Sequence, residues 1–268
     1  MTTTRRTRVP QHRIAESVAA ELRTRILGGE DDYTLPTQDQ LVREFGVSYP
    51  SIREAIRILE TEGLVTVRRG KVGGAEVHRP DRSSAAYHLG LALQGGRVTL
   101  GDLAGGLRML EPICAAECAR REDRAEEVVP VLRANIEKCT ALVDDGVAFT
   151  QLAREFHDLL VAFTPNATVR HVVGSLVALW SAQEEAWAEA LTRRGEYPTR
   201  DEAMTAVRTH RRIVDDIAAG RAGEAERHAC AHLNATQALL LEHFDDGVVN
   251  AASPAARRAI HSSLPARH

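Results

Sequence analysis

Three histidines in the second half of the chain could together bind a divalent metal. His157 stands in QLAREFHDLL, His210 in VRTHRRIVDDI, and His232 in ERHACAHL, with His228 one helical turn before it. Neutral imidazole is the commonest protein ligand for Zn²⁺ and similar ions. The three stretches have separate helical patterns, so the rings can converge on one cavity. The alternative is that each is a packed or surface histidine of an amphipathic helix.

A second group of residues has the chemistry for reading DNA. The turn FGVS is followed by a predicted helix whose first residues are polar or basic. In a helix-turn-helix the second helix enters the major groove, and its N-terminal residues meet the base edges. Arginine matches the two acceptors of guanine, and serine can bond bases or phosphates. The candidates here are Ser48, Tyr49, Ser51, Arg53 and Arg57. The alternative is that the arginines are solvated and pair with Glu54 and Glu60.

The elements around these candidates predict a winged helix-turn-helix. Apolar stripes predict helices over 13–27, from 37 to Phe45, and from Ser48 to Gly63, the second opened by a capping-box pattern of Thr37 with Gln40. LVTVRR and AEVHR then flank the glycine turn GKVGG, which predicts a hairpin. Cations at its tip could touch phosphate or the minor groove. They are Arg68, Arg69 and Lys71 beside Gly70, and an N-terminal arm adds Arg5, Arg6 and Arg8.

The rest of the chain predicts an all-helical domain. We expect a DNA-binding domain over 1–80, a linker with a short docked helix over 81–100, a domain of about six helices over 101–244, and a flexible tail over 245–268. Asn166 is expected to cap a helix. Trp180 and Trp187 are expected in the core or in dimer contacts, and Glu184, Glu185 and Glu189 on a solvated face. The fold class is therefore mainly α.

Bulk properties exclude several classes of protein. The 268 residues are 44% apolar and 26% charged, and no run approaches the ~20 apolar residues that cross a bilayer. The N-terminus lacks the apolar core of a secretory signal. The four cysteines form no Cys-x-x-Cys pair, so we expect reduced thiols in a cytoplasmic protein. Residues 1–82 carry 14 Lys and Arg against 12 Asp and Glu, a net charge of +2, and the remainder carries 20 against 25, a net charge of −5. This asymmetry is weak, so the prediction of DNA binding rests on where the charges fall and not on their total.

The first half resembles the DNA-binding domain of GntR-type bacterial repressors. The resemblance rests on LPTQDQLVREFGVSYPSIREAIRILETEGLVTVRRGKVGGAEV and covers residues 13–79. It implies that Arg53 is the recognition-helix arginine, that Arg69, Gly70 and Lys71 form the wing tip, and that Thr37 joins the DNA contacts. The chain departs from the family at Asp39 and Tyr49, where arginines are common. A phenol can bond a phosphate or pack on a thymine methyl, but it cannot donate two hydrogen bonds to guanine as arginine does.

The second half resembles the FCD effector domain of FadR-like regulators. The resemblance rests on DLAGGLRMLEP, EFHDLL, and the 22-residue spacing from His210 to His232. It implies that His157, His210 and His232 hold a divalent metal, Zn²⁺ or similar, with a small organic acid bound on or beside it. Ala153 stands where the family usually has an aspartate ligand, and some members bind acyl ligands with no metal.

These observations together predict a regulator rather than an enzyme. We expect a homodimeric transcription factor that represses by binding a palindromic operator, and that a small carboxylate or acyl effector releases or re-orients. Arg108 is the candidate for the effector carboxylate, the alternative being a surface pair with Glu111. A metal-dependent enzyme would need a general base beside the metal, and Asp158 and Glu155 point to other faces than His157.

Overall fold

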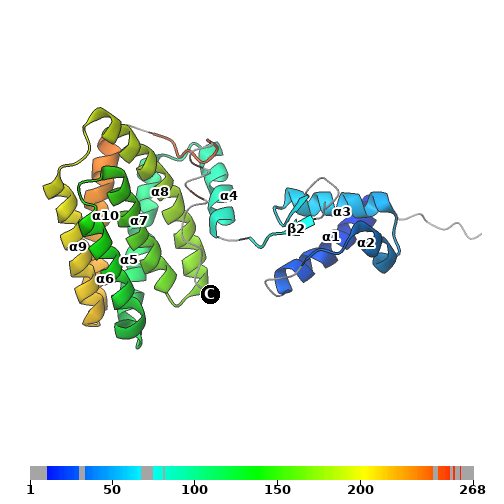
Figure 1. Cartoon of the computed structure of the whole chain (residues 1–268), viewed down its shortest axis with the longest axis horizontal. Coiled ribbons are helices and arrows are strands. Elements are labelled where there is room, and N and C mark those ends of the chain that lie inside the picture. Colours follow the sequence, from blue (N-terminus) through cyan, green and yellow to red (C-terminus); the bar gives the residue numbers. More distant parts are fainter. Residues whose placement is uncertain are drawn as a thin grey trace, which may run out of the picture. The chain divides into compact units, whose positions relative to one another are not determined.

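The computed structural model describes residues 11–29, 34–67, 75–80, 82–243 and 247–253, with Ala256 and Ile260. These residues form ten α-helices, one π-helical turn and one two-stranded sheet, so the chain is mainly helical, as predicted (Figure 1). It divides into two compact units, Met1–Pro80 and Asp81–His268.

The first unit is a winged helix-turn-helix. Its elements are α1 (Gln11–Gly28), α2 (Gln38–Phe45), α3 (Tyr49–Thr61), β1 (Val65–Val67) and β2 (Ala75–Val77). The two strands are antiparallel, with Val65 opposite Val77. The core is built from the predicted apolar stripes, and its fully buried members include Leu22, Ile26, Leu41, Ile52 and Leu59.

Local capping signals fix the geometry of the helix-turn-helix. The Thr37 hydroxyl accepts a hydrogen bond from the backbone of Gln40, whose side chain accepts one from the Thr37 backbone, which completes a capping box. Gly46 ends α2 with φ of 63°, a left-handed conformation that glycine adopts at little cost. Ser48 then caps α3 by accepting from the backbone of Ser51. These three devices set where the recognition helix α3 begins.

The second unit is a helical bundle. It contains α4 (Arg82–Gly95), α5 (Leu100–Arg120), a π-helical turn η1 (Arg124–Val128), α6 (Val129–Ala141), α7 (Gly146–Phe163), α8 (Ala167–Arg194), α9 (Arg200–Ala218) and α10 (Ala222–His243). Helices α5 to α10 stand side by side in Figure 1. One hydrophobic core joins α4, α5 and α8, and a second joins α5, α6, α7, α9 and α10. Helix α5 contributes to both.

Helix α4 and the C-terminal segment are both part of the bundle. Gly90 lies so close to its neighbours that a Cβ there would stand 2.5 Å from the Cβ of Ala251 and 2.6 Å from Leu179. Val249 and Ala251 are buried, and Val248 forms a β-bridge with Thr99. Residues 247–253 fall in the segment expected to be a flexible tail, but their apolar side chains pack on the bundle instead.

Other details follow the sequence. The Asn166 side chain caps α8 by accepting from the backbone of Val169. Trp180 and Trp187 are buried in the core. The four cysteines are free thiols, and burial raises the pKa of Cys114 to about 11. Among the described helices, none combines the length and the apolar character that a membrane span requires.

Candidate functional site

The outer face of the recognition helix carries two exposed arginines. Arg53 and Arg57 are exposed on α3. Within the described residues, neither forms an ion pair with Glu54 or Glu60, the alternative left open by the sequence. The ion pairs of this unit lie elsewhere, for example between Arg23 and Glu62 at 2.5 Å. Both guanidinium groups are therefore available for base or phosphate contacts.

Ser51 does not belong to this face. It is only 2% exposed, and its hydroxyl lies 3.0 Å from that of Ser48. The prediction that Ser51 contacts DNA is wrong, because the cap at Ser48 turns this position towards the core. Thr37 and Ser48 remain exposed, with their hydroxyls engaged in the caps. The predicted wing contacts and N-terminal arm lie outside the described residues: Arg68, Arg69, Gly70, Lys71, Arg5, Arg6 and Arg8.

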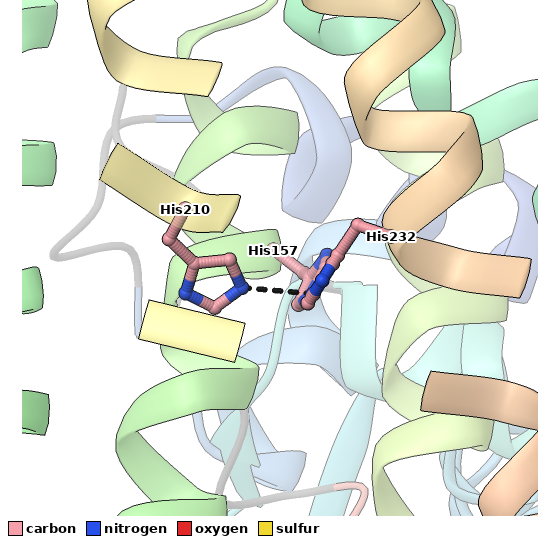
Figure 2. Close-up of side chains that lie close together, drawn as sticks. All are labelled: His157, His210 and His232. Atoms are coloured by element: carbon pink, nitrogen blue, oxygen red, sulfur yellow. Dashed lines mark hydrogen bonds between the residues drawn. The ribbon is translucent and has the colours of Figure 1, made fainter. Parts of the chain in front are cut away.

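The three histidines of the second unit converge as predicted. Figure 2 shows His157 from α7, His210 from α9 and His232 from α10 pointing at one another. The Nε2 atoms of His210 and His232 are 2.9 Å apart, and one potential ligand nitrogen from each ring lies within 4.8 Å of the others. Phe156 stacks on the His210 ring at 3.9 Å between centroids, which fixes its plane.

Burial keeps two of these rings neutral. It lowers the pKa of His232 to about 3 and the pKa of His210 well below its usual value. His157 differs, since burial is opposed by the Glu111 carboxylate, which raises its pKa. The Nδ1 of His157 lies 2.5 Å from Glu111 Oε1. An imidazole that donates from Nδ1 to a carboxylate keeps its Nε2 lone pair for a cation.

The chemistry of the three rings fits a metal site, and one pair of their nitrogens also has the spacing of metal ligands. With metal–nitrogen distances of ~2.1 Å, neighbouring ligand nitrogens lie roughly 3.0–3.4 Å apart. The observed 2.9 Å between His210 and His232 is close to this range. Three neutral imidazoles bring no charge to offset a dication. Glu111, which orients His157 from α5, supplies a carboxylate at the position next to the ligands and so balances part of that charge.

The histidines lie in the wall of a cavity of ≈ 560 Å³. Ala153, at the position of the family's aspartate, lines this cavity and offers no ligand. Arg154 also lines it and is 8% exposed. Its Nε and Nη1 atoms have no hydrogen-bond partner among the described residues, and Oε2 of Glu185 lies 3.6 Å from Nη1. A buried guanidinium with unused donors is matched to a carboxylate ligand.

Two sequence predictions about this region need correction. Glu184 was expected on a solvated face, but it lines the cavity, and burial raises its pKa. Arg108, the candidate for an effector carboxylate, does not line the histidine cavity. It donates to Gln237 at 2.8 Å and borders a separate surface pocket with Met109 and Cys230. The expected alternative of an Arg108–Glu111 pair fails too, because Glu111 is turned inward to His157.

The sequence analysis missed Arg154, although a signal was present. Arg154 precedes His157 by three residues, and residues at that spacing share one face of a helix. Glu111 had no such signal, because its contact with His157 joins positions 46 residues apart. Asp158 and Glu155 line no part of the cavity. Asp158 faces Arg82 and Glu155 accepts from Asn135, so neither stands as a general base beside the histidines.

Comparisons with known proteins assign both units. The model of bacterial regulatory proteins of the gntR family matches residues 14–73, and the FCD domain model matches residues 107–235. The chain belongs to the GntR family. It is a DNA-binding transcriptional regulator with an FCD domain, and not an enzyme.

The relatives of this GntR chain match it over most of their length, and they are named as transcriptional regulators. It is 27% identical over 234 residues to the HTH-type transcriptional repressor NanR of Escherichia coli, which covers 84% of each chain. It is 25% identical to the HTH-type transcriptional regulator YdhC of Bacillus subtilis, over 80% of this chain and 84% of that protein. The solved structure of Streptococcus agalactiae GntR shares the fold, with a TM-score of 0.63, 19% identity, and coverage of 85% and 99%.

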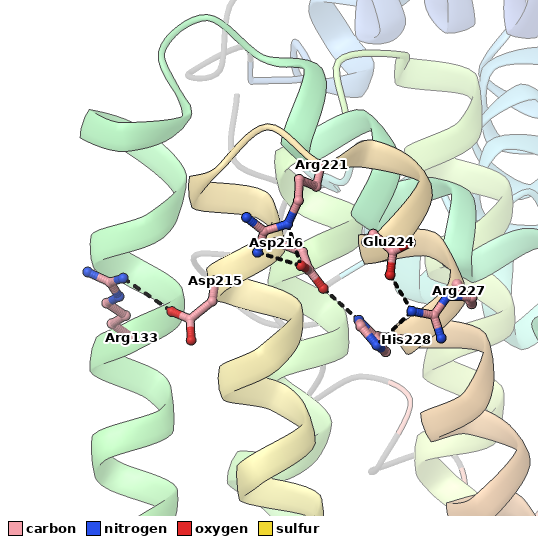
Figure 3. Close-up of polar contacts among 7 residues, drawn as sticks. All are labelled: Arg133, Asp215, Asp216, Arg221, Glu224, Arg227 and His228. Atoms are coloured by element: carbon pink, nitrogen blue, oxygen red, sulfur yellow. Dashed lines mark hydrogen bonds and ion pairs between the residues drawn. The ribbon is translucent and has the colours of Figure 1, made fainter.

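A buried clamp holds the two helices that carry His210 and His232. Asp216 on α9 accepts from Arg221 at 2.8 Å with Oδ1, and its Oδ2 lies 2.6 Å from Nδ1 of His228 on α10 (Figure 3). Burial opposes ionisation of Asp216, but the hydrogen bonds from His228 and Arg221 lower its pKa overall. Stability from the ionised form is therefore present above the unfolded pKa and is lost as pH falls through the lower folded pKa.

Asp216→Ala should destabilise this GntR chain far more than Asp215→Ala. Asp216 is 4% exposed, so its removal leaves Nδ1 of the buried His228 without its partner, at a cost of about 2–4 kcal/mol. Asp215 pairs with Arg133 at 3.4 Å on the surface, where such pairs contribute about 0–1 kcal/mol. Urea unfolding at pH 7 measures both. Equal losses from the two variants would contradict the buried clamp.

Proposed function

We propose that this protein is a cytoplasmic, homodimeric repressor whose hold on a palindromic operator is weakened by a small organic acid. The observation that carries the proposal is the cavity of the FCD domain. It combines three convergent imidazoles with the buried guanidinium of Arg154, so it offers two kinds of attraction to a carboxylate. Since the two winged heads of a dimer would meet two half-sites, a palindrome is the matching DNA symmetry.

A divalent metal held by His157, His210 and His232 is part of this proposal. Such an ion supplies positive charge and open coordination positions that a ligand carboxylate can fill. The protein's own share is orientation: Glu111 fixes the tautomer of His157, and Phe156 holds the plane of His210. Arg154 then receives the same ligand on a second side. This arrangement favours an acid with at least one further polar group.

Apolar side chains left exposed on α5 support self-association. Met109 is 77% exposed, Ile113 is 40% exposed and Leu110 is 37% exposed. Scattered exposed apolar residues are ordinary, but three within one turn and a half of one helix form a local patch. A second copy of the chain is the partner that a palindromic operator requires.

A buried ion pair connects the histidine site to the start of α4, and the chain connects α4 to the DNA-binding unit. Arg82 opens α4, the helix that follows the first unit in the chain, and its Nη1 lies 3.6 Å from Oδ1 of Asp158. Both side chains are buried, and Asp158 is the residue after His157. The approach requires Gly174, because a Cβ there would collide with the Arg82 side chain. A shift of His157 on effector binding is therefore transmitted to the start of α4.

The first test is metal content. The purified protein should hold about one equivalent of a divalent metal, and His210→Ala should lose it because two of three ligands bind far more weakly than three. His171→Gln is the matched control, since His171 is exposed on α8 and is outside the ligand set. Elemental analysis decides. Metal retained by His210→Ala, or absent from the wild type, removes the metal from the proposal and leaves a metal-free effector cavity.

The second test is operator release by carboxylates. Binding to duplexes from the promoter region of its own gene should show one inverted repeat protected, and a member of a panel of lactate, succinate and citrate should weaken that binding. Arg154→Gln should bind the repeat unchanged but require at least about tenfold more acid, the loss expected for one charged hydrogen-bonding partner. Arg208→Gln, an exposed arginine outside the cavity, should behave as wild type. No protected repeat would refute the repressor proposal.

The third test separates coupling from binding. Replacing both members of the buried pair, in Arg82→Met with Asp158→Asn, avoids leaving one charge unpaired. This double variant should bind both the repeat and the acid, yet the acid should no longer weaken DNA binding. A typical coupling factor of roughly 5–150 should fall to near unity. The measurement is operator affinity by fluorescence anisotropy with and without saturating acid, and a ratio equal to that of the wild type would contradict this route.

A further inference from the structure

Helices α2 and α3 of the DNA-binding unit are joined by a side-chain contact that the helix-turn-helix fold does not need. Tyr49, the first residue of α3, donates from its hydroxyl to Oδ1 of Asp39, in the first turn of α2, at 3.0 Å. The two residues are ten positions apart, and both are exposed. Tyr49 keeps 46% of its surface exposed and is outside the core cluster of the unit. The contact therefore contributes little to packing.

The contact places a negative charge where the protein meets DNA. The N-terminal residues of a recognition helix face the base edges, and the preceding helix crosses the phosphate backbone. A carboxylate near phosphates weakens binding electrostatically. The dipole at the start of α2 stabilises the negative charge of Asp39, but it would stabilise a carboxylate anywhere in that turn equally. The tyrosine hydroxyl instead ties Asp39 to the first residue of α3.

The bond leaves the pair with acceptors and no spare donor. Tyr49 uses its single O–H on Asp39, and the bond to that carboxylate raises the pKa of the phenol, so the proton stays on it. Asp39 Oδ2 makes no hydrogen bond to the described residues. What the pair presents outward is therefore a carboxylate oxygen and the lone pairs of a phenol oxygen.

Acceptors in the major groove are matched by base amino groups. Cytosine offers N4–H₂ there without an acceptor beside it. Adenine offers N6–H₂ next to its acceptor N7, guanine offers two acceptors and thymine one, and a carboxylate would be repelled by each of these acceptors. Acidic side chains pair with cytosine N4 for this reason. Arg53, exposed one turn further along α3, has the opposite preference and suits guanine.

We propose that Asp39 and Tyr49 act as one specificity unit that reads a cytosine in each operator half-site. Asp39 accepts from the cytosine N4 amino group, and Tyr49 holds the Asp39 carboxylate in place and contacts the adjoining base or methyl group. The half-site then combines one position read through acceptors, at Asp39, with one read through donors, at Arg53. The inference rests on sequence-specific operator binding, which the selection below tests in the wild type separately.

Binding-site selection from a randomised duplex library tests the unit, using the full-length wild type and Asp39→Asn. The wild type should return a motif with one strongly required C·G pair in each half-site. Asparagine carries both a donor and an acceptor and pairs with adenine N6 and N7. Asp39→Asn should therefore move the preference at that one position from cytosine to adenine, with a change of on the order of tenfold or more in relative affinity. The charge-matched control Glu16→Gln, on α1, should return the wild-type motif.

Tyr49→Phe tests the positioning role. It removes the hydroxyl and keeps the ring, so the same cytosine should be preferred, with discrimination reduced about three- to tenfold. Combined with Asp39→Asn it should add nothing, because residues that act as one unit are not additive. Additive effects would show that the two residues act separately. All variants should unfold close to the wild-type thermal midpoint, since both side chains are exposed and Asp39→Asn loses only the small contribution of the α2 dipole.

The outcomes are distinguishable. If the wild type selects no motif, the operator proposal fails. If the wild type selects a motif and Asp39→Asn returns the same one, the specificity unit is wrong and the operator proposal stands. If Asp39→Asn strengthens binding equally on all sequences, Asp39 acts only through phosphate repulsion, which also overturns the unit.

Discussion

The burial of His210 and His232 edge to edge is the constraint around which the helical domain is arranged. Two imidazoles removed from water must stay neutral, and each buried nitrogen without a partner costs about 1–3 kcal/mol. The 2.9 Å approach of the two Nε2 atoms requires α9 and α10 to keep a fixed register at the level of these two residues. The Asp216–His228 clamp near the connecting turn supplies that register from within the same helix pair. Stability and ligand geometry are therefore set by the same contacts.

Features encoded within a few neighbouring residues were predictable from the sequence. The caps at Thr37, Ser48 and Asn166 depend on side chains that reach backbone groups three residues away. The winged helix-turn-helix and the helical bundle follow from apolar stripes of helical period, and the convergence of the three histidines followed from those stripes together with the family resemblance. The structure confirms these elements. Local and periodic sequence signals are therefore sufficient to predict the structure where a helix buries only one face.

The failures occur where a contact joins distant parts of the chain. Periodicity says that Glu111 and Glu184 lie on helices, but it cannot say that a partner on another helix draws each of them inward. Ser51 failed for a related reason, because its buried side was hidden by the polar character of its hydroxyl. The Tyr49–Asp39 hydrogen bond joins two helices. Each of these residues departs from the family pattern, but neither departure by itself indicates that the two side chains meet. Polar residues are thus the least predictable, since burial depends on partners that the local pattern does not specify.

The charges around the cavity suggest why a small ligand can control the domain. Arg154 faces Glu185 at 3.6 Å, so this buried cation is held by a carboxylate at more than hydrogen-bond distance, and Asp158 lies 3.6 Å from Arg82. Burial raises the pKa of Asp158 to about 6, and the nearby cations only partly oppose it. Loosely paired buried charges are sensitive to any new charge, because the low local dielectric strengthens each interaction. In the proposed regulator, a carboxylate ligand that took the donors of Arg154 would change the balance of charge around His157 and its neighbour Asp158. Since packed interiors rearrange between discrete states, that change would favour a different setting of α4.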